Sequence, residues 1–112
     1  MLASDVITVA RQNLDDTING EERFDDTELL NTLTSSTRRL ATDKPDLLID
    51  SAGAIIPIVD VTTTSQTLIF DRDWLEALSN YVCHLIFAKD SSDDYNANQS
   101  AIHKSLYESA IN

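Results

Sequence analysis

Apolar residues recur at helical spacing along most of the chain, and they predict four helices. The third helix, over residues 73–89, has the broadest apolar stripe, because its large apolar residues fall in one sector of a helical wheel. The stripe consists of Trp74, Leu75, Leu78, Tyr81, Val82, Leu85 and Ala88. The opposite sector holds Glu76, Ser79, Asn80 and Cys83 and forms the polar side of this helix. The pattern predicts a helix that packs on the core through one of its faces and exposes the other to solvent.

The fourth helix, over residues 94–111, has a narrower apolar stripe. Tyr95, Ile102, Leu106 and Ala110 are separated by seven, four and four residues, a spacing that places them on one helical face. We expect this stripe to pack on the third helix, so that the two helices form an antiparallel hairpin. Tyr107 and Ile111 fall outside the stripe.

The first half of the chain predicts two further helices, over residues 5–14 and 26–43. In the first of them, Val6, Ile7, Ala10 and Leu14 fall on one side. The second begins with the clearest start signal in the sequence, Asp25 followed three residues later by Glu28, which is the spacing of a capping box. Its expected inward face is Leu29, Leu30, Leu33, Thr37 and Leu40.

Residues 45–70 have a different character, because β-branched residues gather on both sides of a Thr-rich run. Two short strands over residues 55–70 are expected to form a β-hairpin. Pro57 removes one backbone donor, so its strand should be an edge strand or a bulged strand. The chain thus predicts a mainly α fold, a small four-helix bundle with a β-hairpin or long loop inserted between the second and third helices. Residues 1–112 are expected to form a single domain.

Charge and composition narrow the classes of function. The chain has 19 acidic and 8 basic residues, a formal net charge of −11. Such a balance disfavours adhesion to nucleic acid and to anionic membranes, since phosphate binding needs Lys and Arg. No apolar run approaches the roughly 20 residues of a membrane span, and the start of the chain lacks a signal peptide. Cys83 is the sole cysteine. We therefore expect a soluble protein folded in a reducing cytoplasm, with no internal disulfide.

The residues capable of chemistry form no recognisable site. Asp71, Asp73 and Glu76 lack the glycine and the spacing of an EF-hand loop. His84 and His103 have no second ligand at zinc-site spacing. Adjacent helix residues point about 100° apart, so Cys83 and His84 are not a catalytic pair. The sequence predicts no enzyme, no cofactor and no metal site. It offers contact surfaces instead, with Phe87 on a polar helix side and an excess of apolar residues in the hairpin.

Several segments, in their order and spacing, resemble adaptor proteins of tailed-phage head–tail connectors. The first half contributes VITVARQNLDD over residues 6–16, RFDDTELL over 23–30 and KPD over 44–46. The second half contributes WLEALSNYV over residues 74–82, Phe87-x-Lys89-Asp90, and Ala101 with His103. The resemblance covers nearly the whole chain, although Ile69 stands where some relatives have a proline.

This resemblance implies a structural virion protein at the head–tail interface, made and assembled in the bacterial host cytoplasm. About twelve copies in the family form a ring. The ring would dock under the portal protein and join it to the next tail component, a nozzle or tail-completion protein. Genomic DNA would pass through the lumen without sequence-specific binding, and no membrane would be involved. An acidic lumen is consistent with such passage, since repulsion prevents DNA from sticking.

The expected interface residues lie in the hairpin and in the two C-terminal helices. The hairpin would contact neighbouring subunits or the tail side, and the last helix would face the portal or an adjacent subunit. The candidates are Ile56, Ile58, Ile69, Phe87, Tyr107 and Ile111.

The acidic composition leaves an alternative from another class of protein. An acidic DNA mimic, or a small helical regulator, would bind a nucleic-acid-binding partner through the same negative surface. The two interpretations differ in assembly, because a mimic acts as a monomer or dimer whereas a connector subunit forms a high-order ring with a portal.

Overall fold

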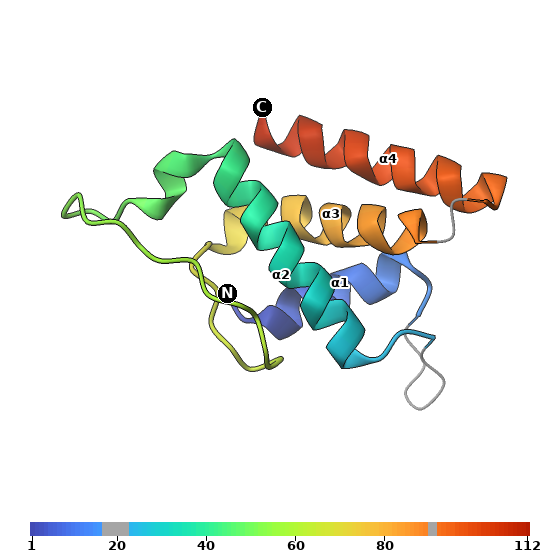
Figure 1. Ribbon diagram of the computed structural model, residues 1–112, viewed down its shortest axis with the longest axis horizontal. Coiled ribbons are helices and arrows are strands. Elements are labelled where there is room, and N and C mark those ends of the chain that lie inside the picture. Colours follow the sequence, from blue (N-terminus) through green and yellow to red (C-terminus); the bar gives the residue numbers. More distant parts are fainter. Residues whose placement is uncertain (17–22, 90–91) are drawn as a thin grey trace.

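Figure 1 shows the computed structural model, which describes residues 1–16, 23–89 and 92–112. These residues are mainly helical, as the sequence predicts. The elements are α1 (Ala3–Asn13), α2 (Asp26–Asp43), the short 3-10 helices η1 (Pro45–Leu48) and η2 (Arg72–Trp74), α3 (Leu75–Ala88) and α4 (Asp94–Ile111). A long connection without a regular strand joins η1 to η2.

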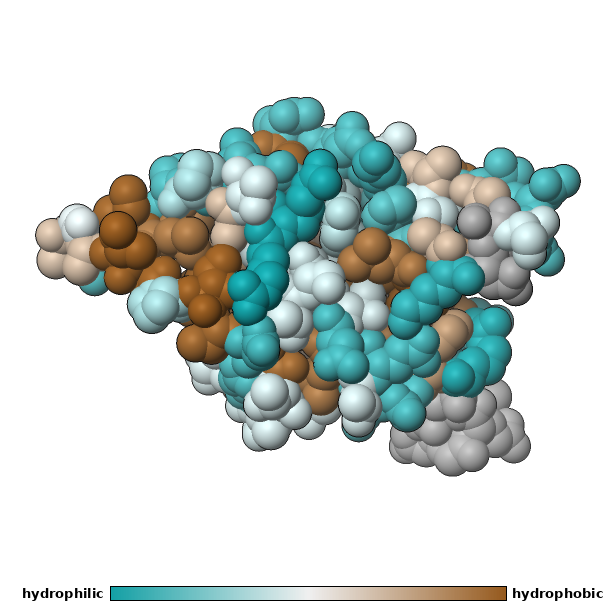
Figure 2. All heavy atoms as spheres, viewed as in Figure 1, coloured by the Kyte–Doolittle hydropathy of each residue, from teal (hydrophilic) through white to brown (hydrophobic). Residues whose placement is uncertain are grey.

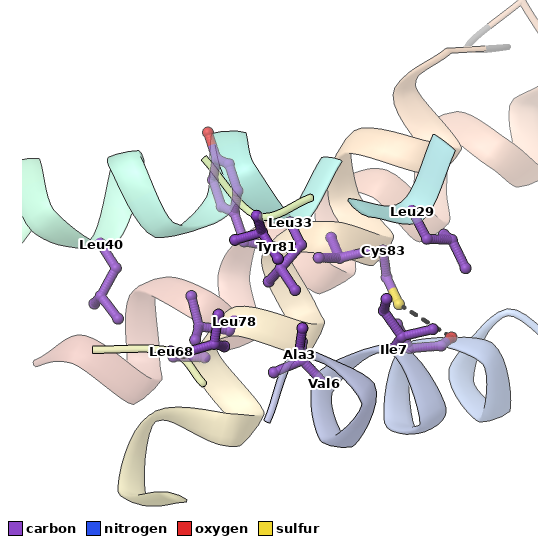
Figure 3. Close-up of a cluster of buried hydrophobic side chains, with 14 of the residues drawn as sticks. Ala3, Val6, Ile7, Leu29, Leu33, Leu40, Leu68, Leu78, Tyr81 and Cys83 are labelled. Carbon is purple, nitrogen blue, oxygen red and sulfur yellow. Dashed lines mark hydrogen bonds between the residues drawn. The ribbon is translucent and has the colours of Figure 1, made fainter. Parts of the chain in front are cut away.

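The helix α3 is the centre of the bundle. It packs on α4 along one side and on α1 and α2 along the other, so the predicted pairing of the last two helices is confirmed. Figure 3 shows the core between α1, α2 and α3, with Leu68 from the long connection added to it. Burial of each such aliphatic side chain stabilises the fold by about 1.5–3 kcal/mol. The labelled members are Ala3, Val6, Ile7, Leu29, Leu33, Leu40, Leu68, Leu78, Tyr81 and Cys83.

Three of the four residues on the predicted polar side of α3 are buried and only Glu76 of the four is exposed, which corrects the one-sided stripe predicted from the sequence. Ser79, Asn80 and Cys83 are all buried. Their polar groups are satisfied locally or across the core. The Ser79 hydroxyl donates to the Leu75 carbonyl, the Asn80 amide donates to the Glu76 carbonyl at 2.9 Å, and Cys83 Sγ donates to the Ala10 carbonyl at 3.7 Å. Small polar residues with satisfied hydrogen bonds can be buried at little cost.

The inward face of α4 is also different from the prediction. Ser100, His103 and Tyr107 are buried against α3, whereas Tyr95, Ile102 and Leu106 of the predicted stripe are 64%, 49% and 47% exposed. The predicted orientation of this helix is therefore wrong, although its predicted residue range is correct. The physical reason is that α3 presents polar groups on this side, and they take polar partners from α4.

The N-terminal helices follow the sequence more closely. Helix α2 has the predicted bounds, and the Asp25 carboxylate accepts from the Glu28 amide at 2.8 Å. The Glu28 side chain itself accepts from Lys89 Nζ at 2.7 Å and so ties α2 to the end of α3. Helix α1 begins two residues earlier than predicted, because the Asp5 carboxylate accepts from the Leu2 amide at 2.9 Å.

The predicted β-hairpin over residues 55–70 is wrong, and the long-loop alternative describes the connection. The described part of the chain contains no strand and only two isolated bridges, Leu2 with Thr67 and Ile49 with Ile55. Backbone groups that a hairpin would pair with each other have other partners. The Ala3 and Ser4 amides donate to the carbonyls of Gln66 and Thr64, at 2.9 and 2.8 Å.

Other backbone groups of the predicted hairpin form hydrogen bonds with side chains instead of with the opposite strand. Gln66 Oε1 accepts from the Thr62 amide and Gln66 Nε2 donates to the Asp60 carbonyl, both at 3.0 Å. Thr34 Oγ1 of α2 accepts from the Val61 amide at 2.9 Å. The connection thus follows the N-terminus and α2, because they offer partners that a lone hairpin lacks.

Candidate functional site

The most prominent surface feature is the arm, which we define as residues 45–60. It projects from the helical bundle at the left of Figure 1. Three of its aliphatic residues point largely into solvent, since Ile49, Ile55 and Val59 are 53%, 79% and 56% exposed. Figure 2 shows hydrophobic side chains gathered at this end of the molecule. A contiguous exposed apolar group of this kind is typical of a contact surface.

The tip of the arm is a defined turn. Asp50 Oδ1 accepts from the amides of Ala52 and Ala54, each at 2.9 Å, and the Asp50 amide donates to the Ala54 carbonyl at 2.9 Å. Gly53 has a φ of +84°, a conformation that a side chain disfavours. The Ile56 amide then donates to the Leu48 carbonyl at 2.6 Å. These bonds hold the two sides of the turn together and fix where Ile55 points.

The base of the arm is attached to the bundle. Leu47, Leu48 and Ile58 pack against the core, and Val61 is only 3% exposed. Arg38 of α2 forms an ion pair with Asp60 at the point where the arm returns to the bundle. The arm is therefore held at its base and presents its apolar residues beyond it.

A second apolar surface lies along α4, on the side that faces away from α3. We call it the outer stripe, made of Ile102 and Leu106. Tyr95 of the predicted stripe instead packs edge-on against Phe87 of α3, with 6.3 Å between the ring centroids. A shallow hollow runs beside it, lined by Ala101, Ile102, Ser105, Leu106 and Ser109. The hollow exists because the side chains next to Ile102 and Leu106 are small. The sequence stripe identified these residues but assigned them to the core.

The interface residues predicted from sequence lie mostly at the edge of the core. Ile56, Ile58 and Ile69 are half-buried in the arm and the connection. Phe87 is also half-buried, with its ring stacked on His103 at 5.7 Å between centroids, and Ile111 packs against the core. None of these five is among the strongly exposed large apolar residues of the described chain.

The predicted exposure of Tyr107 is wrong, because its side chain is only 1% exposed. Its ring packs on Tyr81 at 4.8 Å between centroids, and its hydroxyl donates to Asp43 Oδ2 at 2.6 Å. Burial, followed by the bond to Asp43, raises the pKa of Tyr107 above its ordinary value. The prediction that Tyr107 lies off the core stripe is wrong, so this residue presents no contact surface in the folded chain.

Two histidines take part in the polar contacts between α3 and α4. His84 Nδ1 is 2.8 Å from Ser100 Oγ, and His103 Nδ1 is 2.9 Å from Asn80 Oδ1. Burial, with a smaller contribution from His84, lowers the pKa of His103. The Nδ1 atom of each ring has a polar partner on the other helix. The two histidines therefore have a structural role, which is to connect α3 and α4.

The buried thiol of Cys83 shows no sign of activation. Burial raises its pKa to about 12, so the thiolate form required for nucleophilic chemistry is rare at neutral pH. Within residues 1–16, 23–89 and 92–112 no group of three metal-ligating side chains comes together. No described helix is long and apolar enough to cross a membrane.

In comparisons with known proteins, no family model, curated protein or solved structure matches the chain.

Proposed function

We propose that this chain is a subunit of an adaptor ring in the head–tail connector of a tailed phage. The observation that carries the proposal is the arm, whose exposed residues Ile49, Ile55 and Val59 lie beyond the bundle that could cover them. It interrupts the helices between α2 and α3, where the resemblance implies a long insertion. A lone chain gains nothing from such exposure, whereas a subunit in an assembly buries these residues against its neighbours.

The ring would dock under the portal protein, meet a nozzle or tail-completion protein on its other side and extend the DNA channel. Its role would be structural. The net charge of −11 suits a channel wall, since repulsion between carboxylates and phosphates lets DNA pass without binding. The exposed carboxylates include Asp25, Asp26, Asp46, Asp71, Asp73, Glu76, Asp93 and Asp94.

The test is mass determination by light scattering on the purified chain, alone and mixed with the portal protein encoded in the same genome. We expect stoichiometric loading onto the portal ring. A matched pair of variants links this result to the arm. Ile55→Asp with Val59→Asp is expected to abolish loading, whereas Thr63→Asp, an exposed change in the same connection, is expected to leave it intact. Absence of loading by the unmodified chain would refute the connector role.

The acidic surface also supports the second candidate, an acidic DNA mimic or small helical regulator. It predicts a different outcome in the same experiment. The chain would ignore the portal and form a small complex, of one or two copies, with a DNA-binding protein. Because that contact is between opposite charges, it would weaken as salt is raised.

A further inference from the structure

We propose that the arm of one copy docks on the outer stripe of α4 of the next copy. This inference rests on the proposed function, because it specifies how neighbouring subunits of the ring meet. The two surfaces are separate on the molecule. Figure 1 shows the arm projecting from one end of the bundle. The outer stripe belongs to α4, where Ile102 and Leu106 are about half exposed. A contact between two different surfaces is head-to-tail, the kind that closes into rings.

Charge favours a second copy as the occupant of each surface. Two copies of a chain with a net charge of −11 repel one another overall, so a contact between surfaces without charge brings the least repulsion. Residues 51–59 of the arm have no ionisable side chain. Asp50 and Asp60 flank this uncharged segment. The hollow beside the outer stripe is likewise lined only by Ala, Ser, Ile and Leu. Both surfaces match the uncharged centre of a protein interface.

Shape and length agree with this pairing. Ile55 and Val59 are branched side chains that project from the arm, and Ala101, Ser105 and Ser109 leave space beside Ile102 and Leu106 to receive them. A non-helical stretch from residue 55 to residue 59 spans at most about 14 Å. The helical stretch from residue 101 to residue 109 spans about 12 Å. The two exposed arm residues can therefore lie along the hollow together.

The test is disulfide formation, under mild oxidation, between separately purified variants that each add one cysteine to the native Cys83. Ile55→Cys places a thiol on the arm and Ser105→Cys places one in the hollow, while the buried Cys83 stays out of reach. Because the two cysteines are on different molecules, a cross-link in the mixture reports a contact between copies. The matched control is Lys104→Cys, one residue away on α4 but outside the hollow. Circular dichroism establishes that each variant is helical.

We expect the mixture of Ile55→Cys and Ser105→Cys to give at least about tenfold more dimer than the mixture with Lys104→Cys. Its yield should rise with salt, since screening reduces repulsion between the acidic chains. The cross-linking is carried out with and without the portal protein, and the masses are determined in parallel.

Each outcome decides between the two proposals. A ring on the portal that gives only homodimers of Ser105→Cys, or no cross-link, would overturn the docking but retain the connector role. The specific cross-link without loading on the portal would retain the docking and refute the connector role. Neither loading nor the specific cross-link would refute both.

Discussion

The two faces of α4 reverse the usual relation between polarity and burial. The inner face buries Ser100, His103 and Tyr107, while the outer face exposes about half of Ile102 and of Leu106. Both faces belong to one helix of 18 residues, Asp94–Ile111, so helix propensity cannot explain the difference. The neighbouring groups explain it.

On the inner face, each polar side chain meets a partner on α2 or α3. His103 meets Asn80, and Tyr107 meets Asp43. No buried side-chain nitrogen or oxygen of the described residues lacks a hydrogen-bond partner. On the outer face, Ile102 and Leu106 are about half exposed and are not among the residues that pack against the core. Burial thus follows the available partners. The exposed apolar face is the one that we propose as a contact between copies.

The largest expected effect comes from truncating the inner face. We expect Tyr107→Ala to lower the free energy of unfolding by about 3–5 kcal/mol, because it removes a buried ring and leaves a cavity. Leu106→Ala, one residue away on the outer face, should cost less than about 1 kcal/mol in the isolated chain. Urea denaturation of both variants measures the difference. Equal losses would contradict the orientation of α4.

The polar contact between α3 and α4 should give the next largest effect. Asn80→Ala removes the acceptor of His103 Nδ1 and leaves a buried polar atom unpaired, which costs about 1–3 kcal/mol. Asn98→Ala, at an exposed position of α4, serves as the control and should change the free energy of unfolding by less than about 0.5 kcal/mol. A neutral Asn80→Ala variant would show that this hydrogen bond is unimportant for stability.

The inner face should also make stability depend on pH. Burial lowers the pKa of His103, so its contribution to stability is present above the unfolded value of about 6.5 and is lost as the pH falls below it. His103→Gln cannot bind this proton. Denaturation between pH 7 and pH 5 should therefore show a shallower loss for His103→Gln than for the unmodified chain. Parallel pH profiles would exclude His103 as the responsible group.

The smallest effect on folding is expected on the outer face. Leu106→Glu should change the free energy of unfolding by less than about 0.5 kcal/mol, because the side chain is about half exposed and has room to turn toward solvent. It nevertheless adds a negative charge to an uncharged surface. Sedimentation at increasing concentration should show weaker self-association than for Thr63→Glu, an exposed change outside the stripe. Equal association would argue against the outer stripe as a contact between copies.

The sequence predicted the bounds of α2 and the cap at Asp25, because a cap and apolar periodicity are local signals. It did not predict that Glu28 pairs with Lys89 or that Thr32 and Ser36 are buried. It also predicted the range of α4. The predicted inward face of α4 was wrong, because a helical wheel sorts residues by polarity alone. It contains no information on Asn80 and Asp43, the hydrogen-bond partners that other helices supply. For the same reason, the sequence did not predict that the outer stripe is a surface. The sequence identified its apolar residues and then assigned them to the core.

The prediction of a β-hairpin was wrong for a related reason. The β-branched residues around Pro57 favour extended chain, which is a local property. Whether extended segments pair with each other depends on competing partners, here the N-terminus, Thr34 and the side chain of Gln66.

By itself, the sequence determined the helical class, the bounds of α2 and α4, and the acidic charge, because these properties depend on neighbours along the chain. Only the tertiary structure decided that α3 is buried on both sides, that α4 turns its polar face inward, and that the arm stands away from the bundle. These features depend on which groups meet across the fold. Hydrogen-bond partners and packing contacts of that kind come from residues far apart in the sequence.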